Sequence, residues 1–185
     1  MSRSVIPQVG ARFGTGLAAC LGAGYLAFRG ALFRADTEAF QVLTLGILAA
    51  AILALGRTGR WWHAMAVATG YGIFRLGWSA SEGWVSSSAG LVLGFGLVAV
   101  ALIFELLGRK MLFGKFLVVG PLVGGVFLAA APLEGFRDFA LADAAAQYMR
   151  FAFVGLIIGD GVGLGVEVAD LLLAEGRDAV RGEAG

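Results

Sequence analysis

The sequence has few of the side chains on which most enzyme chemistry depends. Its 185 residues include one cysteine, one histidine and three prolines. A single cysteine excludes an internal disulfide and a thiolate metal cage, because each needs more than one sulfur ligand. His63 lies at the inner end and the serines at 86–88 lie at the outer end of the predicted spans, roughly 20 Å or more apart by helix rise, whereas a Ser–His pair must approach within about 3 Å. We therefore expect no catalytic residue, metal ion or cofactor, and we do not predict an enzyme.

Cys20 follows Leu17-Ala18-Ala19, a pattern typical of the cleavage site of bacterial lipoproteins. A signal peptide also needs a basic region followed by about 7–15 apolar residues. Only Phe13-Gly-Thr-Gly-Leu-Ala-Ala separates Arg12 from Cys20, which is a poor match. We interpret Cys20 as a small residue on a tightly packed helix, with lipidation as the alternative.

Charged side chains are also scarce. They make up 15% of the chain, against about 25% in an average soluble protein. Hydrophobic residues make up 59% and the mean hydropathy is +0.85, more than a soluble domain of this size can bury. A net charge of +1 gives no basic surface for nucleic acid. The composition predicts an integral membrane protein in contact with the lipid bilayer.

Six segments are long and apolar enough to cross a bilayer, which takes about 20 mainly apolar residues. They are residues 13–33, 39–56, 61–79, 84–107, 112–133 and 148–172. We predict an all-α integral membrane protein, an antiparallel bundle of six transmembrane helices with short loops. Residues 134–147 could form a short interfacial helix, and residues 1–12 and 173–185 are expected to be polar cytoplasmic tails.

The distribution of basic residues predicts the orientation of the bundle. With both termini inside, nine lysines and arginines lie in cytoplasmic segments and three lie outside. The inner nine are Arg3, Arg12, Arg57, Arg60, Arg109, Lys110, Lys115, Arg177 and Arg181, and the outer three are Arg29, Arg34 and Arg137. This asymmetry follows the positive-inside rule, so we predict cytoplasmic termini and a bacterial cytoplasmic (inner) membrane.

Glycine is the residue in clear excess, with 30 copies. Small residues four positions apart allow the backbones of two membrane helices to approach closely. The candidate packing positions are Gly90, Gly94, Gly120, Gly124, Gly155, Gly159 and Gly163, and further pairs occur at Gly14-Ala18-Gly22 and Gly161-Gly165. One interpretation is that these faces only hold the bundle together, with the sixth helix the most enclosed. The other is a break at residues 159–165 that exposes backbone groups able to coordinate an ion.

Asp160 is the main candidate for a functional residue. It lies ten residues beyond Arg150, or roughly 15 Å into the membrane, where an acid must be protonated, paired or hydrated. We expect Asp160 to be mostly protonated at neutral pH and to donate a hydrogen bond to a neighbouring helix, for example at Thr69 or Tyr71. A role in proton or ion coupling is the alternative.

Arg75 lies three residues before Trp78, so its guanidinium is expected to reach the outer headgroups. Glu82 or Asp143 could meet it there, and a contact with substrate in an outer vestibule is the alternative. Three further acids are expected near the inner face beside cytoplasmic arginines: Glu105, Glu167 and Asp170, with Arg57, Arg60 or Arg109 as partners.

The sequence is compatible with two functions. The first is a structural, accessory or assembly subunit that packs through glycine-rich helices with a second copy or within a larger membrane complex. The second is a small proton- or ion-coupled transporter or channel, with Asp160 as the coupling acid and Arg75 at its outer entrance.

Overall fold

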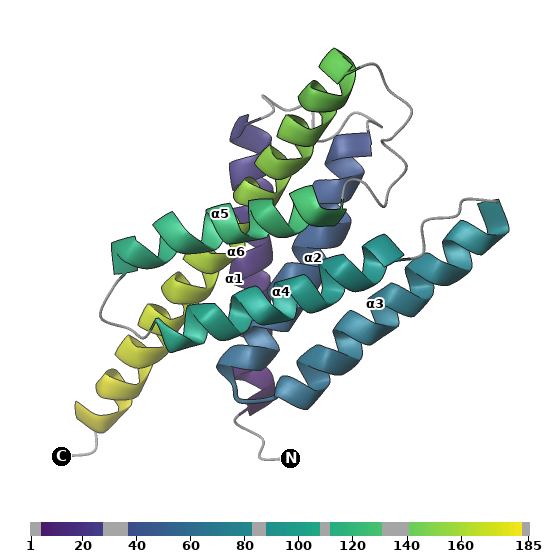
Figure 1. Cartoon of the computed structure of the whole chain (residues 1–185). Helices are drawn as coiled ribbons and strands as arrows, with labels where there is room; N and C mark the ends of the chain where they lie inside the picture. Colours follow the sequence, from purple (N-terminus) through teal and green to yellow (C-terminus); the bar gives the residue numbers. More distant parts are fainter. Residues whose placement is uncertain (1–4, 28–36, 83–87, 108–111, 131–140, 183–185) are drawn as a thin grey trace.

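The computed structural model describes residues 5–27, 37–82, 88–107, 112–130 and 141–182 (Figure 1). Within these ranges the chain forms six helices and no strand, which confirms the all-helical class. The helices are α1 (Val5–Ala27), α2 (Thr37–Arg57), α3 (Trp61–Glu82), α4 (Ser88–Leu106), α5 (Leu112–Ala130) and α6 (Leu141–Gly182).

Two helices extend beyond the apolar segments predicted from the sequence. α1 begins at Val5, and α6 runs from Leu141 to Gly182, so parts of both predicted tails and residues 141–147 are helical. A segment assigned by hydropathy ends at its last apolar residue, whereas a helix can continue through polar residues of good helix propensity. With 42 residues, α6 is about 63 Å long, roughly twice the thickness of a bilayer's hydrocarbon core.

Each helix packs against the next one along the chain, as expected for short connections (Figure 1). α2 lies at the centre, in contact with α1, α3, α4 and α6. Its sequence from Val42 to Leu55 is apolar around most of the helix, and most of these residues are buried, although Leu43 and Ile47 are exposed. α6 packs against α1, α2 and α5 and keeps one exposed face. The apolar stretch Ala152–Ala174 of α6 is more buried than Ala89–Leu106 of α4, in agreement with the prediction that the sixth helix is the most enclosed, although part of its circumference is exposed.

α6 and α1 approach so closely that side chains are excluded at their contact. A Cβ atom on Gly161 would lie 2.6 Å from Cα of Cys20. A Cβ atom on Gly165 would overlap the carbonyl oxygen of Thr15 and lie 2.6 Å from Cα of Gly16. Because these are main-chain atoms, they cannot rotate away as the end of a side chain could. The Gly161-Gly165 pair thus sets the distance between the two helices.

A second glycine face of α6 packs against α5. Cβ atoms placed on Gly155 and Gly159 would lie 3.0 Å from Cα of Gly124 and 3.2 Å from Cα of Gly120. Gly163 is buried as well. α6 is helical through residues 159–165, so the predicted alternative of a broken span is wrong. The glycines serve close packing of an intact helix, and the helix hydrogen bonds satisfy its backbone groups.

The small residues of α1 divide between two faces. Gly16, Cys20 and Gly24 are buried, and Cys20 packs against Gly46 of α2 and Gly161 of α6. A fully buried thiol favours the interpretation of Cys20 as a packing residue. The other face, at Gly14 and its neighbours along the helix, has open space around it.

Among the described residues, two helices are long and apolar enough to cross a membrane: Ala89–Leu106 in α4 and Ala152–Ala174 in α6. Val42–Arg57 in α2 and Val118–Ala130 in α5 are shorter apolar helices. The core helix of a soluble protein can meet the same criterion, so a crossing by all six helices stays a prediction.

Replacement of Gly165 by alanine is expected to destabilise the protein by about 1–3 kcal/mol, the usual range for overpacking. Its new methyl group would meet main-chain atoms of Thr15 and Gly16. Gly14→Ala is the matched control, because Gly14 has nothing within 4 Å of a Cβ atom and alanine is the better helix former. Thermal unfolding in one detergent compares the two. Equal midpoints for wild type and Gly165→Ala would contradict the close approach of α1 and α6.

Candidate functional site

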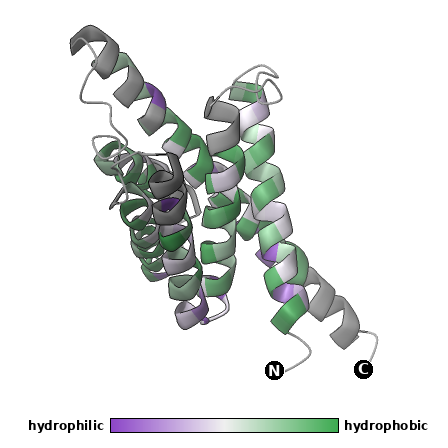
Figure 2. Cartoon of the chain, turned by 90° about the vertical axis from the view of Figure 1, so that its right-hand side faces the viewer, coloured by the Kyte–Doolittle hydropathy of each residue, from purple (hydrophilic) through white to green (hydrophobic). Residues whose placement is uncertain are grey.

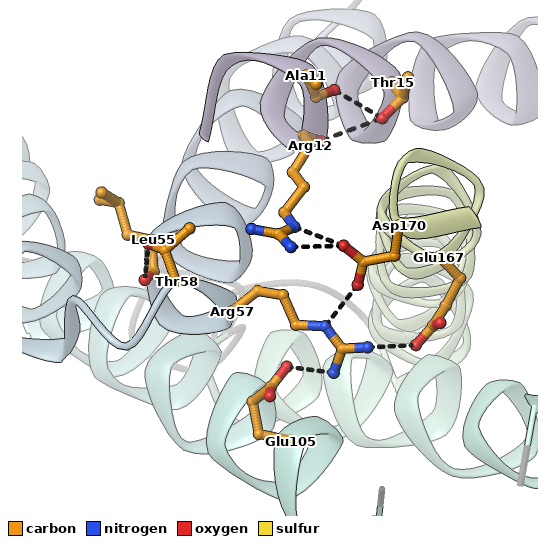
Figure 3. A network of polar contacts seen from close by, with 9 residues as sticks. All are labelled: Ala11, Arg12, Thr15, Leu55, Arg57, Thr58, Glu105, Glu167 and Asp170. Atoms are coloured by element: carbon orange, nitrogen blue, oxygen red, sulfur yellow. Dashed lines mark hydrogen bonds and ion pairs between the residues drawn. The ribbon is translucent and has the colours of Figure 1, made fainter. Parts of the chain in front are cut away.

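Five charged side chains from four helices meet near one end of the bundle (Figure 3). We call this group the arginine–carboxylate cluster; its members are Arg12 of α1, Arg57 of α2, Glu105 of α4, and Glu167 and Asp170 of α6. The antiparallel order of the helices brings these residues together, since the first half of α1 meets the ends of α2 and α4 and the C-terminal half of α6.

Asp170 joins the two arginines. Nε of Arg12 donates to its Oδ1 at 2.7 Å and Nη2 of Arg12 lies 2.6 Å from the same oxygen. The other oxygen, Oδ2, accepts a hydrogen bond from Nε of Arg57 at 2.7 Å. One carboxylate thereby links α1, α2 and α6 (Figure 3). Charge-assisted bonds of this length are among the stronger hydrogen bonds in proteins.

Arg57 is the centre of the arginine–carboxylate cluster. Its Nη1 donates to Oε1 of Glu105 at 2.7 Å, and its Nη2 lies 3.4 Å from Oε1 of Glu167. The guanidinium carbon is 5.9 Å from the centre of the Phe104 ring, a cation–π geometry. Arg57 therefore contacts α4 through Glu105 and Phe104, and α6 through Glu167 and Asp170.

The burial of these charges makes their pairing necessary. The side chains of Arg57, Arg12, Asp170 and Glu167 are 5–8% exposed, and that of Glu105 is 27% exposed. A buried ion pair adds little over an apolar pair of the same shape, but removal of one partner leaves an uncompensated charge. The cluster therefore fixes which helix ends meet, more than it adds to the total free energy of folding.

The sequence predicted part of this arrangement. The three acids were expected beside Arg57, Arg60 or Arg109; they meet Arg57, while Arg109 lies outside the described residues. Arg12 belongs to the predicted polar tail, yet it is only 6% exposed. The spacing of Arg12, Gly16, Cys20 and Gly24 is the signal that could have placed it, because residues four apart share one face of a helix.

Asp160 occupies a different place, at the border between the face of α6 that packs on α5 and the exposed face of α6. Its carboxylate lies over the backbone of Gly120, where a Cβ atom would come 2.5–2.7 Å from the carboxylate atoms. Glycine at position 120 therefore makes room for the acid. Oδ1 is buried and has no hydrogen-bond partner, while the residue as a whole remains partly exposed.

The predicted partners of Asp160 do not lie beside it. Thr69 and Tyr71 belong to α3, which packs against α2 and α4. The Thr69 hydroxyl donates to the carbonyl of Met65, one turn back in its own helix. The expectation of a hydrogen bond from Asp160 to either residue is wrong, because α5 is the helix that covers this side of α6.

Arg75 is also remote from Asp160. It lies on α3 against α4, where a Cβ atom on Gly90 would come 2.6 Å from its Cβ. Gly94 packs on the same helix pair, since a Cβ atom there would lie 2.8 Å from the carbonyl oxygen of Ala68. The side chains of Glu82 and Asp143, suggested as partners of Arg75, lie outside the described residues.

An apolar cavity of about 20 Å³ lies between α2, α4, α5 and α6. It has room for about one water molecule. Its lining includes Leu53, Phe104, Val123 and Gly159, so Phe104 stands between the cavity and Arg57. Asp160 is not part of the lining.

The described side chains offer little to bind a metal ion. No group of three His, Cys, Asp or Glu side chains within the described ranges is arranged to hold one. The carboxylates of the arginine–carboxylate cluster accept hydrogen bonds from Arg12 and Arg57 instead.

No protein-family model, curated protein or solved structure is similar to the chain.

Replacement of Arg57 by leucine should destabilise the protein by about 3–5 kcal/mol, the usual cost of breaking a buried pair. Three carboxylates would lose their shared partner. Arg60→Leu is the matched control, three residues further and outside the cluster. The free energy of unfolding in mixed detergent micelles distinguishes them, and a loss no greater for Arg57→Leu than for Arg60→Leu would refute the structural role.

Proposed function

We propose that this chain is an integral membrane protein that acts as a structural or assembly subunit of a membrane complex. The surface supports the membrane part of the proposal. Large apolar side chains are exposed on every helix, and Figure 2 shows hydrophilic positions mainly toward the helix ends. Examples from successive helices are Leu26, Ile47, Ile73, Leu102, Leu128 and Leu164. Large exposed apolar surfaces are rare on soluble monomers, so exposed apolar side chains on all six described helices support contact with lipid or another apolar surface.

The observation that carries the assembly role is the position of Asp160. It lies within the exposed face of α6, between Leu156 and Leu164, which are 37% and 49% exposed. In hydrocarbon a polar side chain on such a face costs free energy unless it finds a polar partner. Oδ1 is buried against α5 without a hydrogen-bond partner, so another membrane helix would meet the part of the Asp160 side chain that remains exposed.

Transport by Asp160 is the second candidate, because a partly exposed acid at mid-membrane depth suits proton binding. Two features weigh against it. The small cavity between the helices is apolar, and Asp160 does not line it. The neighbouring α5 and α6 are in backbone contact at Gly120 and Gly159, so they leave no path between them at that level.

Proton flux into proteoliposomes separates the two functions. For a subunit that does not transport, a pH gradient should drive no more flux with the wild-type protein than with protein-free vesicles. Asp160→Asn keeps the size of the side chain and serves as the comparison. A gradient-driven flux in wild type that is lost in Asp160→Asn would replace the assembly proposal with proton coupling.

The assembly role also predicts a complex in native membranes. After extraction with a mild detergent, the tagged chain should migrate on a native gel as a species larger than one copy. Asp160→Leu should reduce that species, whereas Ile73→Leu on α3 should not. A wild-type chain that migrates only as a single copy would contradict the proposal.

The membrane topology has its own test. Reporter fusions after Arg60, Lys115 and Arg177 should report a cytoplasmic position, and fusions after Glu82 and Asp138 an external one. The expectation rests on the asymmetry of basic residues. An external reporter signal at Arg177 would overturn the six-span arrangement.

A further inference from the structure

We infer that the exposed face of α6 binds the same face of a second copy, with the two Asp160 side chains paired at the centre of the interface. This inference rests on the proposed function and names the partner helix. On the exposed face of α6, Asp160 interrupts a stripe of exposed apolar residues. The stripe consists of Met149, Phe153, Leu156, Leu164 and Leu171, which are 72%, 49%, 37%, 49% and 58% exposed.

The spacing of this stripe suits contact with another helix. Met149 and Leu156, Phe153 and Asp160, and Leu164 and Leu171 are each seven residues apart. A repeat of seven keeps one seam of a helix against its partner over several turns. In such seams a single polar residue fixes the register and the number of helices, at some cost in stability. Asp160 occupies that position here.

The chemistry of the acid indicates a second copy as the partner. A protonated carboxyl group has one donor and free acceptor capacity, so two of them satisfy each other. Two carboxyl groups at hydrogen-bond distance cannot both ionise, so the pair retains at least one proton. A symmetric contact brings each residue of the central level near its own counterpart, which is the arrangement a lone acid needs.

The surroundings of Asp160 leave space for this contact. The Asp160 carboxylate packs on the backbone of Gly120, and the next residue of α5, Pro121, is exposed. Gly125, further along the exposed side of α5, also has nothing within 4 Å of a Cβ atom. Between the exposed side chains of Val118 and Leu128, the exposed positions of α5 are Pro121 and Gly125, which leaves room for a second α6 at the level of Asp160.

The inference is tested with the purified full-length protein reconstituted in liposomes at decreasing protein-to-lipid ratios. Single-molecule photobleaching counts the copies in each vesicle. Wild type should form dimers, and Asp160→Asn should do so too, because a pair of amides can also donate and accept. Asp160→Leu should weaken dimerisation about 3- to 20-fold, the range of one interhelical hydrogen bond in a membrane.

Cysteine cross-linking tests the geometry without changing Asp160. Under mild oxidation Leu164→Cys should join two copies by a disulfide, whereas Ile73→Cys, 61% exposed on α3, should not. The native Cys20 is buried and does not compete. Dimers of undiminished affinity in Asp160→Leu, or cross-links at Ile73→Cys in place of Leu164→Cys, would overturn the inference.

A failure of this inference can be told apart from a failure of the proposed function. A purified protein that is monomeric at every dilution, while the larger species persists in native membranes, overturns pairing with a second copy and leaves assembly with another partner. If neither the dimer of the purified protein nor the larger species in native membranes is found, the assembly role is contradicted as well.

Discussion

The pairing of Arg57 with three carboxylates is the constraint on which the rest of the bundle depends. Arg57 and Asp170 bring α2 and α6 together, and Glu105 and Arg12 add α4 and α1. Each of these side chains would be too costly to bury alone. When the five side chains of the arginine–carboxylate cluster are buried together, both of its arginines are paired with acids, and this pairing requires α1, α2, α4 and α6 to meet as they do in the structure. The glycine contacts then determine how closely the remaining lengths of those helices can pack.

In α6, the buried acids determine the rotation of the helix, and the glycines determine how closely its neighbours approach. At its C-terminal half, Glu167 and Asp170 fix its rotation, because both must point into the bundle. With that rotation, Gly161 faces α1 and Gly159 faces α5, where both positions exclude a side chain. The same rotation leaves Asp160 on the partly exposed side. Its position at the border of the exposed face is thus a consequence of the packing.

How far the sequence predicted this molecule depends on the kind of signal. Helix number followed from apolar segments of the right length, and close contacts at Gly155 and Gly159 followed from their spacing. The partners of Asp160 could not be predicted, because one sequence does not tell which helices are neighbours across the bundle. The burial of Arg12 escaped prediction for a different reason. A hydropathy criterion assigns an arginine at the end of an apolar segment to the polar tail, because the criterion takes no account of an acid such as Asp170 that is distant in the sequence.

The central claim is that α6 meets another membrane helix at the level of Asp160, and that this helix is α6 of a second copy. The most direct measurement is a pulsed electron-spin distance in lipid, with one spin label at Leu164→Cys and Cys20 replaced by alanine. The account predicts a short distance between labels on two copies, consistent with helix axes about 8–10 Å apart. It also predicts loss of that distance when unlabelled protein is added in excess. A sample without a short intermolecular distance at Leu164→Cys would contradict it.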